Sequence, residues 1–256
     1  MKEYSSMDRH ASSAELKAKA KGQMLGKYGT LVPAILVVEV IMTAINFMAT
    51  FSLDTRTMPG LTIQFVIECL LQLLAGIFLA GQTYMYLNVS CGGNIKISDV
   101  FYGFTNHPDK AILIQLLQLL LCLAFFVPLF ICLGVFTFID GTFSVMLLLL
   151  SVTFCIGLVG STIISLQYSQ SYFVMLDFPE FTAVQCLRYS REIMKGNKAR
   201  RFYLGVSFLP LYLLGLLTCC IGLLFVIPYS NTAFCNFYLE LMSYRNNHSR
   251  TNPSQE

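Results

Sequence analysis

The sequence contains long apolar runs separated by short polar segments, and these runs constrain the fold more than any other feature. Four of them are at least 20 residues long: Leu31–Thr50, Leu61–Leu87, Ala111–Phe138 and Phe143–Tyr168. A helix rises about 1.5 Å per residue, so about 20 apolar residues cross the roughly 30 Å hydrocarbon core of a bilayer. Charged residues make up only 12% of the 256 positions, whereas a soluble domain has about a quarter. The sequence therefore predicts an all-α, polytopic membrane bundle.

The last third of the chain permits two membrane topologies. A fifth apolar run, Phe202–Leu217, is short, and apolar character resumes through Gly222–Met242 after the segment "TCCIG". If Phe202–Ile227 is one helix, the chain crosses five times and its two ends lie on opposite sides. If Thr218–Gly222 is a turn, six transmembrane helices form and both ends lie on the same side.

Lysine and arginine distinguish these topologies, because cytoplasmic loops are enriched in them. In the six-helix topology only Arg56 lies on the outer side. The inner side then holds Lys2, Arg9, Lys17, Lys19, Lys21, Lys27, Lys96, Lys110, Arg188, Arg191, Lys195, Lys198, Arg200, Arg201, Arg245 and Arg250. A five-helix topology would place the last two outside, so the pattern favours three hairpins with both termini cytoplasmic.

The same pattern predicts one membrane domain with polar ends. Residues 31–242 form the six-helix domain, after a cytoplasmic interfacial helix within residues 1–30 and before a cytoplasmic tail at residues 243–256. Ser12 and Glu15 have capping-box spacing, so we expect the first interfacial helix to begin there and to end near Gly26. Similar segments containing a glycine, "VFYGFTNHPDK" and "EIMKGNKARR", precede the later pairs of apolar runs. The repeated unit is an interfacial segment, a break and a helical hairpin.

The third interfacial segment predicts a basic amphipathic helix at about residues 179–196. Asp177 and Pro179 are typical of a helix start, and Gly196 with Asn197 of a helix end. Such a helix buries its apolar face at the headgroup boundary, where its cations attract anionic lipids. The residues expected to dock membrane lipids or a membrane-protein partner are Arg188, Arg191, Lys195, Lys198, Arg200 and Arg201. The alternative is that these cations serve only as a topology signal and anchor.

The first two apolar runs carry polar side chains at helical spacing. They are Glu39, Thr43 and Asn46 in the first run and Gln64, Glu68 and Gln72 in the second. A turn near Thr55 sets these triplets opposite each other, in the pairs Glu39–Gln72, Thr43–Glu68 and Asn46–Gln64. Polar groups in hydrocarbon need internal partners, so one interpretation is an interhelical hydrogen-bond network. Ionisable groups at this depth also mark ion or substrate paths, which leaves open a small transporter or proton-coupled channel.

Catalytic and cofactor motifs do not emerge from the sequence. The segment "GQMLGKY" has one residue too few between its glycines for a phosphate-binding loop and ends in Tyr28 instead of Ser or Thr. His10, His107 and His248 are isolated, without the spacing of metal ligands. We therefore expect no enzyme activity, no metal, no cofactor and no nucleic-acid partner.

Three segments carry a family resemblance: "ISDVFYGF", "MKGNKARRFYL" and "GLLTCCIGLLFVIPYSNTAFCNFY". They resemble the bacterial integral-membrane family catalogued as domain of unknown function 975, and the resemblance extends over essentially the whole chain. It implies a location in the bacterial plasma membrane and no known catalytic role. More distantly, the layout is similar to the membrane domain attached to some glycerophosphodiester phosphodiesterases, but this chain lacks their catalytic domain. The expected function is that of a non-enzymatic membrane protein that interacts with lipids or a partner, with the transporter as alternative.

Overall fold

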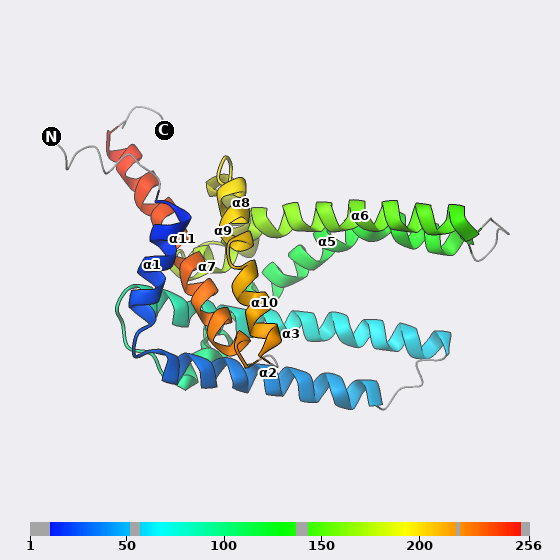
Figure 1. Ribbon diagram of the computed structural model, residues 1–256, viewed down its shortest axis with the longest axis horizontal. Coiled ribbons are helices and arrows are strands. Elements are labelled where there is room, and N and C mark those ends of the chain that lie inside the picture. The colour runs from blue at the N-terminus through cyan, green and yellow to red at the C-terminus, as the bar shows by residue number, and fades with distance from the viewer. Residues whose placement is uncertain (1–10, 52–56, 137–142, 219–220, 252–256) are drawn as a thin grey trace.

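The computed structural model describes residues 11–51, 57–136, 143–218 and 221–251, and every element in these ranges is helical. Two long hairpins dominate the structure. The first joins α2 (Tyr28–Phe51) to α3 (Met58–Ser90), and the second joins α5 (Pro108–Phe136) to α6 (Phe143–Tyr168). In Figure 1 both hairpins project from one end of the molecule, here called the base, where the shorter helices gather. The all-helical prediction is confirmed.

Five stretches of the described chain are long and apolar enough to cross a bilayer: Tyr28–Phe51, Met58–Ser90, Pro108–Val135, Val145–Asp177 and Lys198–Leu217. Their large apolar side chains mostly point outward; Leu148 and Ile131, for example, are 63% and 60% exposed. Exposing so much apolar surface to water is unfavourable, whereas lipid chains would cover it at no such cost. The structure is therefore that of a membrane protein.

Close packing within the second hairpin depends on glycine. A Cβ atom added at Gly160 would lie 2.0 Å from Cδ1 of Phe125, and one added at Gly157 would lie 2.8 Å from the ring of Phe126. Small residues let two membrane helices approach closely. In lipid the hydrophobic effect does not drive helices together, so their association depends on such van der Waals contact. The sequence of α6 thus determines how closely α5 packs on it.

The segment before the second hairpin forms η2 (Ile97–Phe101) and α4 (Tyr102–Thr105), both packed on α3. The contact is made through Gly81 and Gly103. A Cβ at Gly81 would lie 1.9 Å from the carbonyl oxygen of Val100, and one at Gly103 would lie 2.2 Å from that of Ile77. Gly103 is therefore a packing residue, and the chain breaks later, at His107, whose φ is 56°.

The first and third predicted breaks are confirmed at glycines. Helix α1 (Ser13–Met24) begins with a reciprocal capping box between Ser12 and Glu15, as predicted. It is followed by Gly26 with φ 78°, and α8 (Ala183–Ile193) is followed by Gly196 with the same φ. This left-handed conformation is common at helix C-termini and favours glycine.

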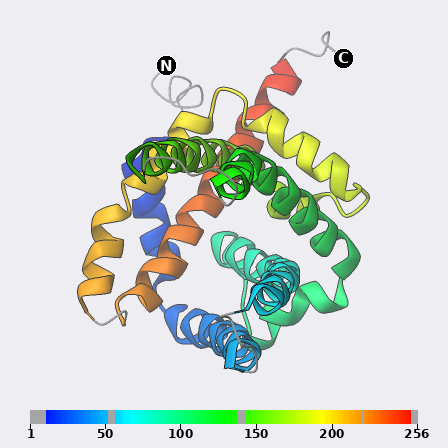
Figure 2. The ribbon, with the colours of Figure 1, turned by 90° about the vertical axis from the view of Figure 1, so that its right-hand side faces the viewer.

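The last apolar region is divided into α9 (Lys198–Val206), α10 (Leu209–Leu217) and α11 (Leu223–Thr251), which follow α7 (Ser171–Asp177) and α8. Because α10 ends at Leu217 and α11 begins at Leu223, Phe202–Ile227 is not one helix. The Oγ1 atom of Thr218 accepts a 3.1 Å hydrogen bond from the Gly222 N–H across this break. In Figure 1 and Figure 2, however, α10 and α11 run across the long hairpins instead of alongside them. They pack on each other without forming a third parallel hairpin.

The buried core lies in the base, where the short helices meet the ends of the hairpins. Tyr238, Phe237 and Phe208 are its largest fully buried side chains. Tyr238 stacks on Phe173 with ring centroids 5.1 Å apart, and its hydroxyl donates a 2.6 Å hydrogen bond to Asp177. Helices distant in sequence are thereby held together at one end of the molecule.

Candidate functional site

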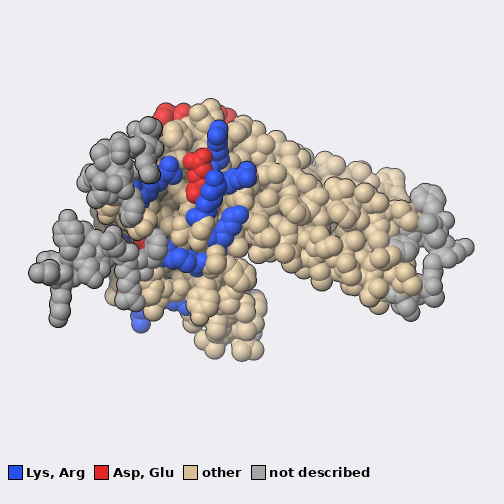
Figure 3. All heavy atoms as spheres, turned by 90° about the horizontal axis from the view of Figure 1, so that it is seen from above, with Lys and Arg blue, Asp and Glu red and all other residues tan. Residues whose placement is uncertain are grey.

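Charged side chains mark one end of the molecule. Figure 3 shows the Lys, Arg, Asp and Glu side chains of one face gathered over the base, and none on the described part of the projecting surface seen in that view. The first hairpin carries two carboxylates, Glu39 and Glu68. Three groups of residues are candidates for function: the cations of α8 and the cations of α9, which lie in the base, and the polar stripe of the first hairpin, which lies outside it.

The basic helix of the third unit begins later than the sequence predicts. Asp177 ends α7, and α8 begins at Ala183 after a reciprocal capping box between Thr182 and Gln185. Thr182 is the N-cap residue, because its hydroxyl oxygen accepts a hydrogen bond from the backbone N–H of Gln185. A helix that began near Asp177 would have needed the same kind of hydrogen bond to the Asp177 side chain. The observed helix, Ala183–Ile193, is thus shorter than the predicted helix at about residues 179–196.

The apolar face of α8 is buried inside the protein. Ala183, Cys186, Leu187 and Ile193 are each at most 7% exposed, and α8 packs on α5, α6 and α7. Burial also raises the pKa of the Cys186 thiol to about 11. The expectation that this face is buried at the headgroup boundary is therefore wrong, because the protein core already covers it.

The opposite face of α8 carries exposed cations. Arg188 and Arg191 on α8 are exposed, as is Lys195 in the turn that follows the helix, and we call these three cations the α8 basic face. Arg188 lies 3.7 Å from Glu192, one turn further along the helix. An exposed pair of this kind contributes at most about 0.5 kcal/mol, so it leaves the arginine available to other anions.

The α9 cations, in contrast, point into the structure in three different directions. Lys198 Nζ donates a 2.6 Å hydrogen bond to Oε1 of Gln167 in α6. Arg200 forms an ion pair with Glu240 of α11, with a shortest N–O distance of 2.8 Å. Arg201 stacks on the ring of Phe234, with 3.4 Å between its guanidinium carbon and the ring centroid. The sequence grouped these cations with the α8 basic face, but the turn of the helix separates them.

The Arg200–Glu240 pair connects three parts of the chain. Oε1 of Glu240 also accepts from the backbone N–H of Ala11 at 3.0 Å, and Arg200 donates to the carbonyl oxygen of Ala11 at 3.1 Å. The two side chains are 27% and 16% exposed. Sequence reasoning missed Glu240, although a lone carboxylate within an otherwise apolar stretch was a signal that it needed a partner.

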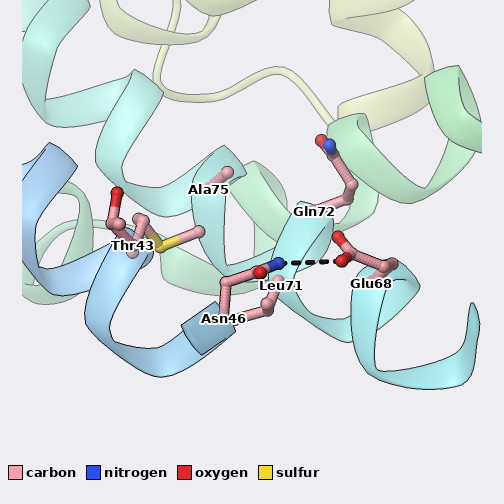
Figure 4. Close-up of a pocket in the computed structure, with 7 residues that line it drawn as sticks. Thr43, Asn46, Glu68, Leu71, Gln72 and Ala75 are labelled. Carbon is pink, nitrogen blue, oxygen red and sulfur yellow. Dashed lines mark hydrogen bonds between the residues drawn. The ribbon is translucent and has the colours of Figure 1, made fainter. Parts of the chain in front are cut away.

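The polar stripe of the first hairpin forms a network, but in a different register from the prediction. Asn46 Nδ2 donates to Glu68 Oε1 at 2.8 Å (Figure 4), and Gln64 Nε2 donates to the same oxygen at 3.1 Å. Gln64 also donates to Thr50 Oγ1 at 3.2 Å. Glu68 therefore pairs with Asn46 and not with Thr43, which is a shift of about one helical turn.

The remaining stripe residues lie more openly. Thr43 and Gln72 line a hollow of about 300 Å³ together with Asn46 and Glu68 (Figure 4). Glu39 is exposed one turn before Thr43 and lies outside this lining. Among the described residues, Glu39 and Gln72 form no hydrogen bond with each other. The structure thus brings four of the six stripe residues around one polar hollow.

Comparison with known proteins gives one match. A family model described as "Protein of unknown function (DUF975)" matches residues 7–245. The chain belongs to the DUF975 family. No curated protein and no solved structure matches it.

The DUF975 match includes all three candidate groups, from Glu39 to Glu240, so none of them lies in an appended segment. The family description itself assigns no activity. In the described part of the chain, no three His, Cys, Asp or Glu side chains lie together as metal ligands would. The chemistry available is that of exposed cations, a polar hollow and buried hydrogen-bonding groups.

Proposed function

We propose that this DUF975 protein is a non-enzymatic integral membrane protein that binds anionic lipid headgroups through the α8 basic face. The observation that carries the proposal is the orientation of α8. Its apolar face is buried in the core, so Arg188, Arg191 and Lys195 are held on the outer face of the base. A helix packed in the core and the turn that follows it present these cations at little entropic cost, as a preorganised surface does.

The proposed location is the bacterial plasma membrane, with both termini cytoplasmic and six membrane passages. The support is that cations flank the apolar spans at the base, where the hairpins start or end; examples are Lys27, Lys96, Lys110 and Lys198. Cations at such positions are typical of the cytoplasmic side. The candidate span Lys198–Leu217, which comprises α9 and α10, is proposed as the fifth passage and α11 as the sixth. Because the chain turns between α10 and α11, the C-terminal tail returns to the N-terminal side.

The expected strength follows from membrane electrostatics. Each cation near an anionic leaflet contributes about 1 kcal/mol, and the attraction decays over roughly 8–10 Å at ordinary salt. Three aligned cations therefore favour an anionic over a neutral surface by about 3 kcal/mol at most. Without them, the hairpins would still hold the protein in either membrane.

The test compares thermal stability in nanodiscs of phosphatidylglycerol with that in nanodiscs of phosphatidylcholine. The wild type should be more stable in the anionic discs, and Arg188→Gln/Arg191→Gln/Lys195→Gln should lose most of this difference. The control variant Lys19→Gln/Lys21→Gln/Lys96→Gln removes three other exposed cations of the base. If both triple variants lose the preference equally, the effect belongs to the overall charge of the base and the assignment to α8 is wrong.

A second candidate function, a small transporter or proton-coupled channel, is favoured by the polar hollow of the first hairpin. Glu68 is half-buried there and accepts two amide hydrogen bonds. An ionisable group in an apolar hairpin is a usual feature of ion paths. In proteoliposomes with an imposed pH gradient, this candidate predicts proton flux that Glu68→Gln abolishes and that Glu39→Gln, outside the hollow, leaves unchanged.

A further inference from the structure

A second polar cavity lies inside the base, between α3, α7, α9 and α11, which converge there (Figure 1). Its volume is about 150 Å³. The polar residues of its lining are Gln82, Thr83, Tyr86, Ser169, Tyr172, Arg201 and Asn231. A cavity of this size and polarity is roomy enough for several waters or for one tetrahedral oxyanion.

Arg201 provides the positive charge of this cavity. Its guanidinium stacks on Phe234, which fixes the plane of the group. Its Nε atom is buried and has no hydrogen-bond partner among the described residues. None of the described side chains that line the cavity is a carboxylate. The charge is thus desolvated on one side without a protein anion to offset it, which is costly unless an anion from outside takes that place.

Other lining groups divide into occupied and available donors. The hydroxyls of Thr83 and Ser169 donate to backbone carbonyls, and that of Tyr172 donates to Gln115. The Tyr86 oxygen, in contrast, accepts from Asn231 at 3.3 Å, which leaves its own O–H to donate. The Gln82 amide adds a further donor to the lining. Arg201, Gln82 and Tyr86 therefore converge as donors on one small space.

We propose that this cavity binds an oxyanion of the phosphate type, held by the Arg201 fork with help from Gln82 and Tyr86. Planar arginine donors match the paired oxygens of a phosphate, and neutral donors complete its coordination. The anion is either free inorganic phosphate or the terminal phosphate of a lipid headgroup, since both present the same oxygens. The site is separate from the α8 basic face, so it stands or falls independently of the proposed lipid preference.

The test measures the thermal stability of the full chain in neutral detergent while one ligand is titrated at constant ionic strength. One arm uses inorganic phosphate and the other short-chain phosphatidic acid, with potassium chloride as reference. We expect saturable stabilisation in one of the two arms, and the arm that responds identifies the source of the phosphate. Lys21→Gln, which removes an exposed cation outside both this cavity and the α8 basic face, should bind as the wild type does.

Two variants probe the site itself. Arg201→Gln should abolish the saturable shift, and Gln82→Leu, which keeps the cation, should weaken binding by roughly threefold to tenfold. The second variant keeps the test decisive if the first does not fold. The proposal is overturned if neither ligand stabilises the wild type beyond potassium chloride, or if Gln82→Leu binds with unchanged affinity.

Discussion

Gly81→Ala should destabilise the protein by separating α3 from η2. The added Cβ would lie 1.9 Å from the Val100 carbonyl oxygen, whereas ordinary contact begins near 3.4 Å. The obstacle is a backbone atom, so no side-chain rotation can relieve it. The two elements must move apart by about 1 Å or more, at the expense of packing around the fully buried Val100.

The expected magnitude combines two opposing effects. Overpacking costs about 1–3 kcal/mol, and the better helix propensity of alanine returns up to about 1 kcal/mol. A net loss of about 1–2 kcal/mol corresponds to a Tm lower by roughly 2–8 °C for a chain of this size. Because the chain contains no tryptophan, far-UV circular dichroism in detergent is a suitable measurement.

The matched control is Gly29→Ala in α2, where an added Cβ meets nothing within 4 Å. Its Tm should stay the same or rise slightly. A second comparison adds Val100→Ala to Gly81→Ala, which should not restore stability because the carbonyl oxygen remains. Wild-type stability of Gly81→Ala, or rescue by Val100→Ala, would show that the α3–η2 contact is not made as described.

Three further outcomes are expected. A membrane-impermeant maleimide should label Cys91, which is exposed at the base, faster than the buried Cys186, whose raised pKa keeps it as the unreactive thiol. In intact cells Cys91 should stay unlabelled until the membrane is opened. Prompt labelling of Cys91 in intact cells would contradict a cytoplasmic base. A reporter fused at Asn246 should read as cytoplasmic, and an external reading would contradict the six-passage topology. Arg200→Met should lower the free energy of unfolding by about 1–3 kcal/mol, since Glu240 loses its cation; the double variant with Glu240→Met should cost less than the two single variants combined, and simple additivity would show that the pair is not coupled.

The sequence predicted local features where a few neighbouring residues decide the outcome. The Ser12–Glu15 capping box and the breaks at Gly26 and Gly196 were found where they were expected. Such signals are reliable because capping hydrogen bonds and left-handed backbone angles depend on residues within one turn. The start of α8 was misplaced because Asp177 and Thr182 both suit a helix start, and sequence alone did not rank them.

The candidate site was predicted only in part, for a different reason. Glu68 and Asn46 were expected in one network, but their register depends on where the connection between α2 and α3 turns, and that turn lies outside the described residues. An error of about one turn there moves every facing pair by three or four residues. The cavity around Arg201 was missed entirely, since its lining is assembled from parts of the chain as distant as Leu79 in α3 and Phe234 in α11.

By itself, the sequence determined the helical class and the membrane environment, because long apolar runs have no other stable solution in a bilayer. It also predicts that nearly all cations lie on one side of the membrane, from the loops in which they occur. Only the tertiary structure decided which cations remain exposed. Arg188, Arg191 and Lys195 face outward because α8 packs its other face in the core, whereas Arg200 and Arg201 turn inward to Glu240 and Phe234 of α11. Amphipathic spacing indicates that a helix has two faces, but only the packing of distant helices determines what each face contacts.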